Sequence, residues 1–134
     1  MCLDSVVREY VIKKDKEVYK VVLVHRDKQD HLRYYPLFNH TGMAFLKGRN
    51  EAIVEPVEYY PFTHSNSKGW YASGYHCFGK IEDARFYNLY ELAGGCNVIK
   101  CVIPAGTRVT AGYTHVINNS KRLYTLVTPV LIMR

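Results

Sequence analysis

Apolar, β-branched and aromatic residues dominate two early stretches, residues 6–12 and 17–26, and a polar run separates them. This pattern predicts two strands joined by a turn. Residues 18–24 are almost continuously apolar, which indicates a central strand. Later stretches of the same character predict further strands at 32–38, 52–57, 71–78, 96–103, 108–110, 113–117 and 123–133. We expect seven to nine strands in a mainly antiparallel sheet.

One long segment has helical spacing instead. Its apolar residues recur three or four positions apart, and it ends at a pair of glycines, which is a strong stop signal. Gly79 is the expected N-cap, and Glu82 with Asp83 add negative charge to the first turn, where the helix dipole favours it. One main helix at about 80–93 on a mainly antiparallel sheet predicts the α+β class. The length fits a single domain, 1–134.

The net charge of the chain is +6, and the charges are unevenly spread. Residues 1–50 carry ten basic and six acidic residues, residues 51–93 carry three and six, and residues 94–134 carry five and none. The chain also contains 12 tyrosines. Tyrosine together with positive charge suits a planar anionic partner such as a nucleotide, and it equally suits an ordinary β-rich fold.

No apolar stretch approaches the roughly 18 residues that cross a bilayer. The first residues lack the basic and apolar regions of a secretory signal. We therefore expect a cytoplasmic protein with reduced cysteines and no membrane partner. Cys77 and Cys101 are expected in the core, and the absence of C-x-x-C spacing argues against a metal site. Nucleotide fingerprints are absent as well, so we predict no cofactor.

The most informative segment is 74–107. Strand alternation places Gly74 and His76 on one face, and Gly74 allows a ligand or another backbone to approach closely. Lys80 stands at the predicted helix start, where free amides attract anions. Arg108 follows the P-x-G turn, close to the end of the strand that we expect beside the His76 strand. These three polar residues are candidates for holding a phosphate or carboxylate. The plainer interpretation is a hydrogen-bonded strand histidine and two surface cations.

Four further residues complete the predicted ligand-binding site. Tyr75, Tyr87 and Tyr113 carry rings that can stack on a base. Lys100 alternates with apolar neighbours, so it faces away from the core or into a cleft. No catalytic residue is predicted, because no histidine is placed by motif beside a serine or cysteine nucleophile.

The pattern G-x-H-x-F at 74–78, E-D-A at 82–84 and P-x-G at 104–106 resembles a group of small uncharacterised proteins of bacteriophages and gut bacteria. The opening M-C-L and the early E-V-Y-K-V stretch are similar to the same group. This resemblance carries no established activity. It implies a context, the cytoplasm of a bacterial host, in which a phage protein counters host defence.

A weaker resemblance is to the ADP-ribosyltransferase fold. It rests on the order and spacing of the G-Y-H-C-F strand, the E-D-A-R-F-Y helix and the V-I-K-C-V-I-P-A-G strand. The resemblance would place His76 where that family has an aromatic residue packed on nicotinamide. Those enzymes usually need a late glutamate on a strand, which stabilises positive charge in the transition state. Here nothing acidic follows Glu91, which lies on the predicted helix. A shared fold without the reaction is therefore expected.

Three functions remain open from the sequence. The first is a non-enzymatic binding protein for a small anionic nucleotide-type ligand, such as an anti-defence protein that sequesters a host immune signal. The second is a protein–protein interaction module or an inhibitor of a host enzyme, because tyrosine favours interfaces. The third is a nucleotide-modifying enzyme of ADP-ribosyltransferase-like fold. Nucleic acid is disfavoured because the basic residues do not form one run, and a homo-oligomer is compatible with short edge strands.

Overall fold

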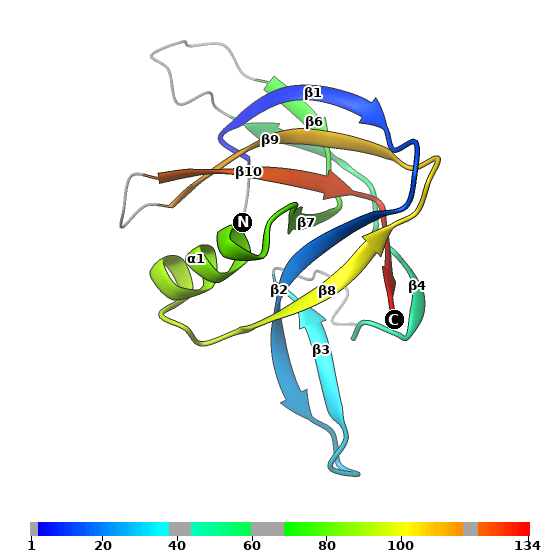
Figure 1. Cartoon of the computed structure of the whole chain (residues 1–134), viewed down its shortest axis with the longest axis vertical. Coiled ribbons are helices and arrows are strands. Elements are labelled where there is room, and N and C mark those ends of the chain that lie inside the picture. Colours follow the sequence, from blue (N-terminus) through cyan, green and yellow to red (C-terminus); the bar gives the residue numbers. More distant parts are fainter. Residues whose placement is uncertain (1–2, 38–43, 60–68, 117–120) are drawn as a thin grey trace.

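The computed structural model describes residues 3–37, 44–59, 69–116 and 121–134. Within these ranges the chain forms eleven strands and one helix (Figure 1). In chain order they are β1 (Ser5–Val11), β2 (Lys16–Arg26), β3 (Leu32–Pro36), β4 (Gly48–Glu51), β5 (Pro56–Tyr59), β6 (Gly69–Ala72), β7 (Tyr75–Phe78), α1 (Ile81–Leu92), β8 (Asn97–Ile103), β9 (Arg108–Val116), β10 (Lys121–Thr128) and β11 (Val130–Met133).

Nine of these strands form one sheet in the order β1-β9-β10-β7-β2-β8-β11-β4, and β3 pairs with β2 beside this path. Strands β5 and β6 form a separate two-stranded ribbon. In Figure 1, β1, β9 and β10 run across the top of the view, and β2 and β8 run obliquely below them. Strand β7 joins the two halves, because it pairs with β10 over four residues and with β2 only through Tyr19 and Phe78. The result is a strongly curved sheet.

The expected antiparallel sheet and main helix are confirmed, but the class is mainly β rather than α+β. The expected strand at 52–57 is also wrong, because most of that stretch links β4 to β5. Glu51 ends the pairing with β11, and Ala52 donates from its amide to the carbonyl of Pro129 at 2.9 Å. Short strands such as β4 form through pairing with distant segments, which local sequence patterns do not report.

The N-cap of helix α1 lies one residue later than predicted. Lys80 rather than Gly79 is the N-cap, and no side chain caps this end, while Glu82 and Asp83 lie in the first turn as expected. At the other end Ala93 adopts the left-handed conformation, with φ of 52°. In the described part of the chain, no helix is both long enough and apolar enough to cross a membrane.

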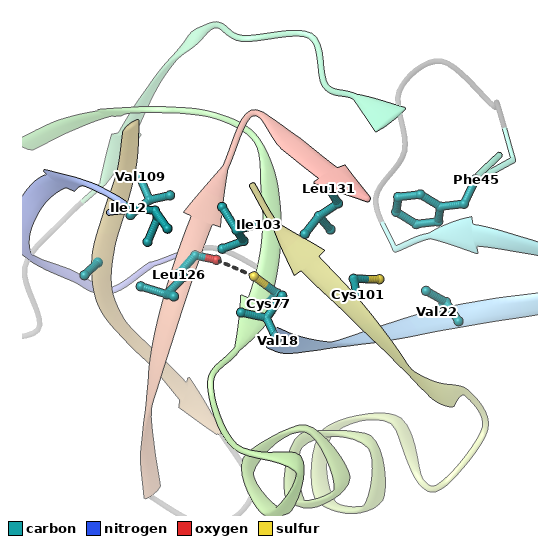
Figure 2. Close-up of a cluster of buried hydrophobic side chains, with 11 residues drawn as sticks. Ile12, Val18, Val22, Phe45, Cys77, Cys101, Ile103, Val109, Leu126 and Leu131 are labelled. Atoms are coloured by element: carbon teal, nitrogen blue, oxygen red, sulfur yellow. Dashed lines mark hydrogen bonds between the residues drawn. The ribbon is translucent and has the colours of Figure 1, made fainter. Parts of the chain in front are cut away.

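The main core lies on the concave side of the sheet, which we call the inner face (Figure 2). Its buried side chains come from strands of both halves and include Ile12, Val18, Val22, Phe45, Cys77, Cys101, Ile103, Val109, Ala111, Leu126 and Leu131. The opposite, outer face is covered in two places. Helix α1 packs on one part around Phe78 and Tyr87, and Leu3 with Tyr71 of β6 packs on the other. The expected core positions of Cys77 and Cys101 are confirmed.

Candidate functional site

His76 does not present a cation to a ligand. It pairs with Val127 of β10, and its ring meets the ring of Tyr71 edge-on, with 6.3 Å between centroids. The Nε2 atom is buried, and it has no hydrogen-bond partner among the described residues. Burial, and secondly the nearby ammonium of Lys20, lower the pKa of His76 to about 3. The imidazole is therefore neutral at pH 7 and cannot hold a phosphate by charge.

The three predicted cations lie apart from His76 and from one another. Lys80 is exposed at the start of α1, and Lys100 is exposed on β8 with Glu17 4.0 Å away. Arg108 opens β9 and contacts the carboxylate of Glu9 on β1 at 3.2 Å. The expected neighbourhood was wrong because β2 separates β8 from β7, and β10 separates β9 from β7. The predicted anion site is therefore not assembled by the fold.

Two of the three predicted tyrosines serve packing. Tyr75 packs on Phe45 of the inner core with 5.1 Å between ring centroids. Tyr87 is a buried residue of α1, and its ring lies 5.7 Å from that of Phe78. Tyr113 differs, because it is only partly buried on β9 and lies beside other aromatic and basic side chains. It belongs to the best candidate for a ligand-binding surface.

Five side chains on the inner face of β1, β9 and β10 form this surface, which we call the tyrosine–arginine ladder: Arg8, Tyr10, Tyr113, Arg122 and Tyr124. The strand register explains why they share one face, since residues paired across antiparallel strands point the same way. Arg8 and Tyr10 of β1 stand opposite Ala111 and Val109, both in the inner core, and Tyr124 stands opposite Tyr113.

Contacts join the members of the ladder in two groups, Arg8 with Tyr10 and Arg122 with Tyr113 and Tyr124. The guanidinium of Arg8 lies 4.3 Å from the centre of the Tyr10 ring, and that of Arg122 lies 4.9 Å from the Tyr113 ring. The rings of Tyr113 and Tyr124 meet edge-on at 5.7 Å. Burial, and secondly the electrostatic influence of Tyr124, raise the pKa of Tyr10. The ladder therefore offers three aromatic rings together with two guanidinium groups.

The two arginines are held differently. Arg122 donates to Asp4 Oδ1 at 3.1 Å and to the hydroxyl of Ser5, so its position is fixed by the segment that leads into β1. The other carboxylate oxygen, Asp4 Oδ2, is buried and finds no hydrogen-bond partner in the described part of the chain. Arg8 is exposed, and within the described ranges its guanidinium forms no salt bridge. Among the described residues the Tyr10 ring is the partner found for this guanidinium, which leaves its N–H groups available to an anion.

An open groove adjoins the ladder at Tyr10. It has a volume of about 510 Å³ and follows the turn from Tyr10 to Glu17 between β1 and β2. Lys13, Lys14 and Lys16 line it, together with Asp15 and Glu17. Asp15 accepts a hydrogen bond from the amide of Ala105 at 2.9 Å, which fixes the turn. The ladder thus continues into a surface with an excess of lysine.

Lys20 is a buried ammonium that sequence reasoning missed. It is 2% exposed and donates to the carbonyl of His76 at 2.8 Å, a bond that ties β2 to β7. Burial lowers its pKa to about 8, and burial likewise raises the pKa of the nearby thiols of Cys77 and Cys101 to about 12 and 11. The available signal was alternation, because Lys20 falls between Val18 and Val22 on a strand whose inner side is otherwise apolar.

Comparison with known proteins identifies no relative of this chain. No family model, no curated protein and no solved structure matches the chain. The resemblances to phage proteins and to the ADP-ribosyltransferase fold therefore stay predictions.

Proposed function

We propose that the protein binds a small anionic nucleotide-type ligand on the tyrosine–arginine ladder. The observation that carries the proposal is that each arginine of the ladder lies over a tyrosine ring within 5 Å. A tyrosine ring can stack on any nucleobase, and each such contact contributes about 1–3 kcal/mol. A guanidinium stacked on a ring keeps its N–H edge free for bidentate contact with phosphate.

The proposed site keeps the ligand class expected from the sequence but changes most of the residues. Tyr113 is the member of the predicted set that lies on the ladder. Arg122 and Tyr124 come from the same basic C-terminal third, whereas Arg8 and Tyr10 come from the opposite end of the chain. Antiparallel pairing of β1 with β9 brings the two ends together.

The composition of the ladder favours binding over turnover. Its five side chains supply aromatic faces and positive charge, and Asp4, which contacts Arg122, is engaged by it through Oδ1. General acid–base chemistry needs a titratable group within hydrogen-bond reach of the reacting atom. Binding without conversion is also what sequestration of a signalling nucleotide requires, which makes that anti-defence role the corresponding biological proposal.

Calorimetric titration tests the proposal directly. Cyclic nucleotides and ADP-ribose derivatives are titrated into the protein, and the recovered ligand is analysed by chromatography. We expect heat with at least one of them, at least tenfold weaker binding after Arg122→Gln or Tyr113→Ala, and intact ligand. Arg49→Gln is the matched control, because Arg49 is an exposed arginine paired with Glu51 on the distant strand β4. No heat with any ligand, or conversion of the ligand, contradicts the proposal.

A second candidate function, an interaction module, is favoured by exposed apolar side chains elsewhere. Trp70 on β6 is 62% exposed, and Ile53 and Val54 before β5 are 60% and 51% exposed. Exposed apolar side chains gathered into a patch mark interaction surfaces, including those of homo-oligomers. If self-association uses this region, sedimentation velocity should show a concentration-dependent oligomer that Trp70→Ser weakens and Leu89→Ser, a change on α1, does not. A monomer at all concentrations would argue against a homo-oligomer.

A further inference from the structure

Four basic side chains gather where the tyrosine–arginine ladder meets the groove at the turn between β1 and β2. Arg8 reaches over the ring of Tyr10 at 4.3 Å from its centre, and Tyr10 itself lines the groove. Lys13, Lys14 and Lys16 line the groove as well. Within the described residues, none of these four cations forms a salt bridge. Their charges are therefore available to an anionic ligand.

The two carboxylates of the groove, in contrast, both have partners. One oxygen of Asp15 accepts a hydrogen bond from the amide of Ala105 at 2.9 Å, and Glu17 lies 4.0 Å from the ammonium of Lys100. Both partners belong to neighbouring segments and not to the lysines of the groove. The groove thus carries an excess of positive charge, which attracts anions.

The groove opens on the same face of the sheet as the ladder. Tyr10 belongs to both, and Lys16 pairs with Ile103 of the inner core. Residues paired across antiparallel strands point the same way, so Lys16 stands on the inner face, as Arg8 and Tyr10 do. A ligand that lies on the ladder can therefore extend into the groove without leaving this face.

The strand register places Arg8 between the aromatic part of the ladder and the groove. Along β9, Arg8 stands opposite Ala111 and Tyr10 stands opposite Val109, so Arg8 is closer to Tyr113 by two residues, about 7 Å. A ligand held at Tyr113 that extends toward the groove therefore meets Arg8 first and then the lysines.

Backbone hydrogen bonds hold the turn of the groove in place. The amide of Ile12 donates to the carbonyl of Thr107 at 2.9 Å, and the amide of Gly106 donates to the carbonyl of Ile12 at 2.7 Å. Together with the bond to Asp15, they join this turn to the one between β8 and β9. The backbone that carries the lysines is thus ordered before a ligand arrives, which lowers the entropic cost of binding.

We infer that the groove binds a chain of linked phosphates, so that the ligand of the ladder is a nucleoside di- or triphosphate. Its base stacks at Tyr113, and its phosphates lie between Arg8 and the three lysines of the groove. The inference rests on the proposed function and specifies its ligand class. A cyclic monophosphate carries one phosphate and meets one part of this row of cations, whereas a phosphate chain meets both Arg8 and the lysines.

A phosphate series tests the inference. Adenosine mono-, di- and triphosphate are titrated by calorimetry in buffer without divalent metal ions, and inorganic phosphate, pyrophosphate and tripolyphosphate form a second arm that lacks the base. We expect the dissociation constant to fall about tenfold or more from the mono- to the triphosphate, because each added phosphate gains charge-assisted contacts. Tripolyphosphate should bind about tenfold or more weakly than adenosine triphosphate, because it lacks the stacked base.

Lysine variants show whether the gain comes from the groove. Lys13→Gln and Lys14→Gln should each weaken triphosphate binding about threefold, the size of one exposed ion pair, and should leave monophosphate binding nearly unchanged. Lys28→Gln is the matched control, because Lys28 is an exposed lysine of the turn at the opposite end of β2 and its loss changes the net charge equally. It should leave both affinities nearly unchanged. Circular dichroism checks that each variant is folded.

The possible outcomes separate the groove from the ladder. A monophosphate that binds as tightly as the triphosphate, or an equal loss in Lys28→Gln and Lys13→Gln, overturns the inference but leaves the proposed function standing. Tripolyphosphate that binds as tightly as adenosine triphosphate overturns the inference that one nucleotide spans both surfaces. Absence of binding by the adenosine phosphates, the cyclic nucleotides and the ADP-ribose derivatives overturns both the inference and the proposed function.

Discussion

Lys20 shows how a single residue can set the pH response of this fold. Its ammonium is enclosed by the inner core, and it donates a hydrogen bond to a neutral carbonyl, that of His76. Among the described residues no carboxylate forms a salt bridge with it. A buried charge without a counter-charge opposes folding, and here the cost appears as a pKa lowered from 10.5 to about 8.

The lowered pKa of Lys20 predicts that stability rises with pH above about 8. In that range the unfolded state still binds a proton that the folded state has lost, so the free energy of unfolding increases by up to about 1.4 kcal/mol per pH unit. Unfolded cysteines ionise over the same range, while Cys77 and Cys101 stay protonated in the folded state, so they oppose the rise equally in the native chain and in Lys20→Met. Urea unfolding of both proteins between about pH 7.5 and 9 therefore measures the contribution of Lys20 as the difference between their slopes. Lys20→Met should abolish the rise. An equal slope in the variant would show that Lys20 does not titrate there.

Gly74 provides a second test at the scale of one residue. A Cβ atom at this position would lie 2.5 Å from the carbonyl oxygen of Thr128, so β7 and the end of β10 approach too closely for a side chain. The expected close approach is thus made by backbone. Gly74→Ala should lower the free energy of unfolding by about 1–3 kcal/mol. Gly79→Ala is the control, because a Cβ there meets nothing within 4 Å. Equal stability of the two variants would contradict this view.

At the scale of elements, the positions of the helix and of the main strands could be predicted from the sequence, but the neighbours of each strand in the sheet could not. The 3.6-residue period and the terminal glycines placed α1, and apolar alternation placed β2 and β8, because these signals lie within each segment. The insertion of β2 between β7 and β8 depends on long-range pairing. Tyr113 could be proposed from the basic C-terminal third, whereas the contribution of β1 to the ladder follows only from its register with β9.

The pairing of β1 with β9 also predicts that two arginines of the same region behave differently. Arg108 lies on the exposed surface and bridges to Glu9 at 3.2 Å, whereas Arg122 lies over the Tyr113 ring. Arg108→Gln should leave nucleotide affinity within about twofold and stability within about 1 kcal/mol, the usual range for an exposed ion pair. Arg122→Gln should weaken binding tenfold or more. Calorimetry compares the nucleotide affinities of the two variants. A larger loss of affinity in Arg108→Gln than in Arg122→Gln would contradict this prediction.

At the scale of the whole molecule, coverage of the curved sheet decides where a ligand can bind. Helix α1 closes the outer face beneath the β9–β10 end, and the Leu3–Tyr71 cluster closes it near His76. The inner face is filled by the main core (Figure 2) but remains partly exposed at Tyr10, Tyr113 and Tyr124. These partly exposed tyrosines therefore lie on the same part of the inner face as Arg8, from near the N-terminus, and Arg122, from the C-terminal third.

Mapping of amide chemical shifts tests the location of the site most directly. Nitrogen-15-labelled protein is titrated with the nucleotide that gives the largest heat in the calorimetric titration, and the shifts are followed residue by residue. The account predicts that saturable changes concentrate on β1, β9 and β10 around residues 8–10, 113 and 122–124. Changes centred on residues 76–80, changes centred on Trp70, or no saturable changes at all would contradict the assignment of the ladder as the binding surface.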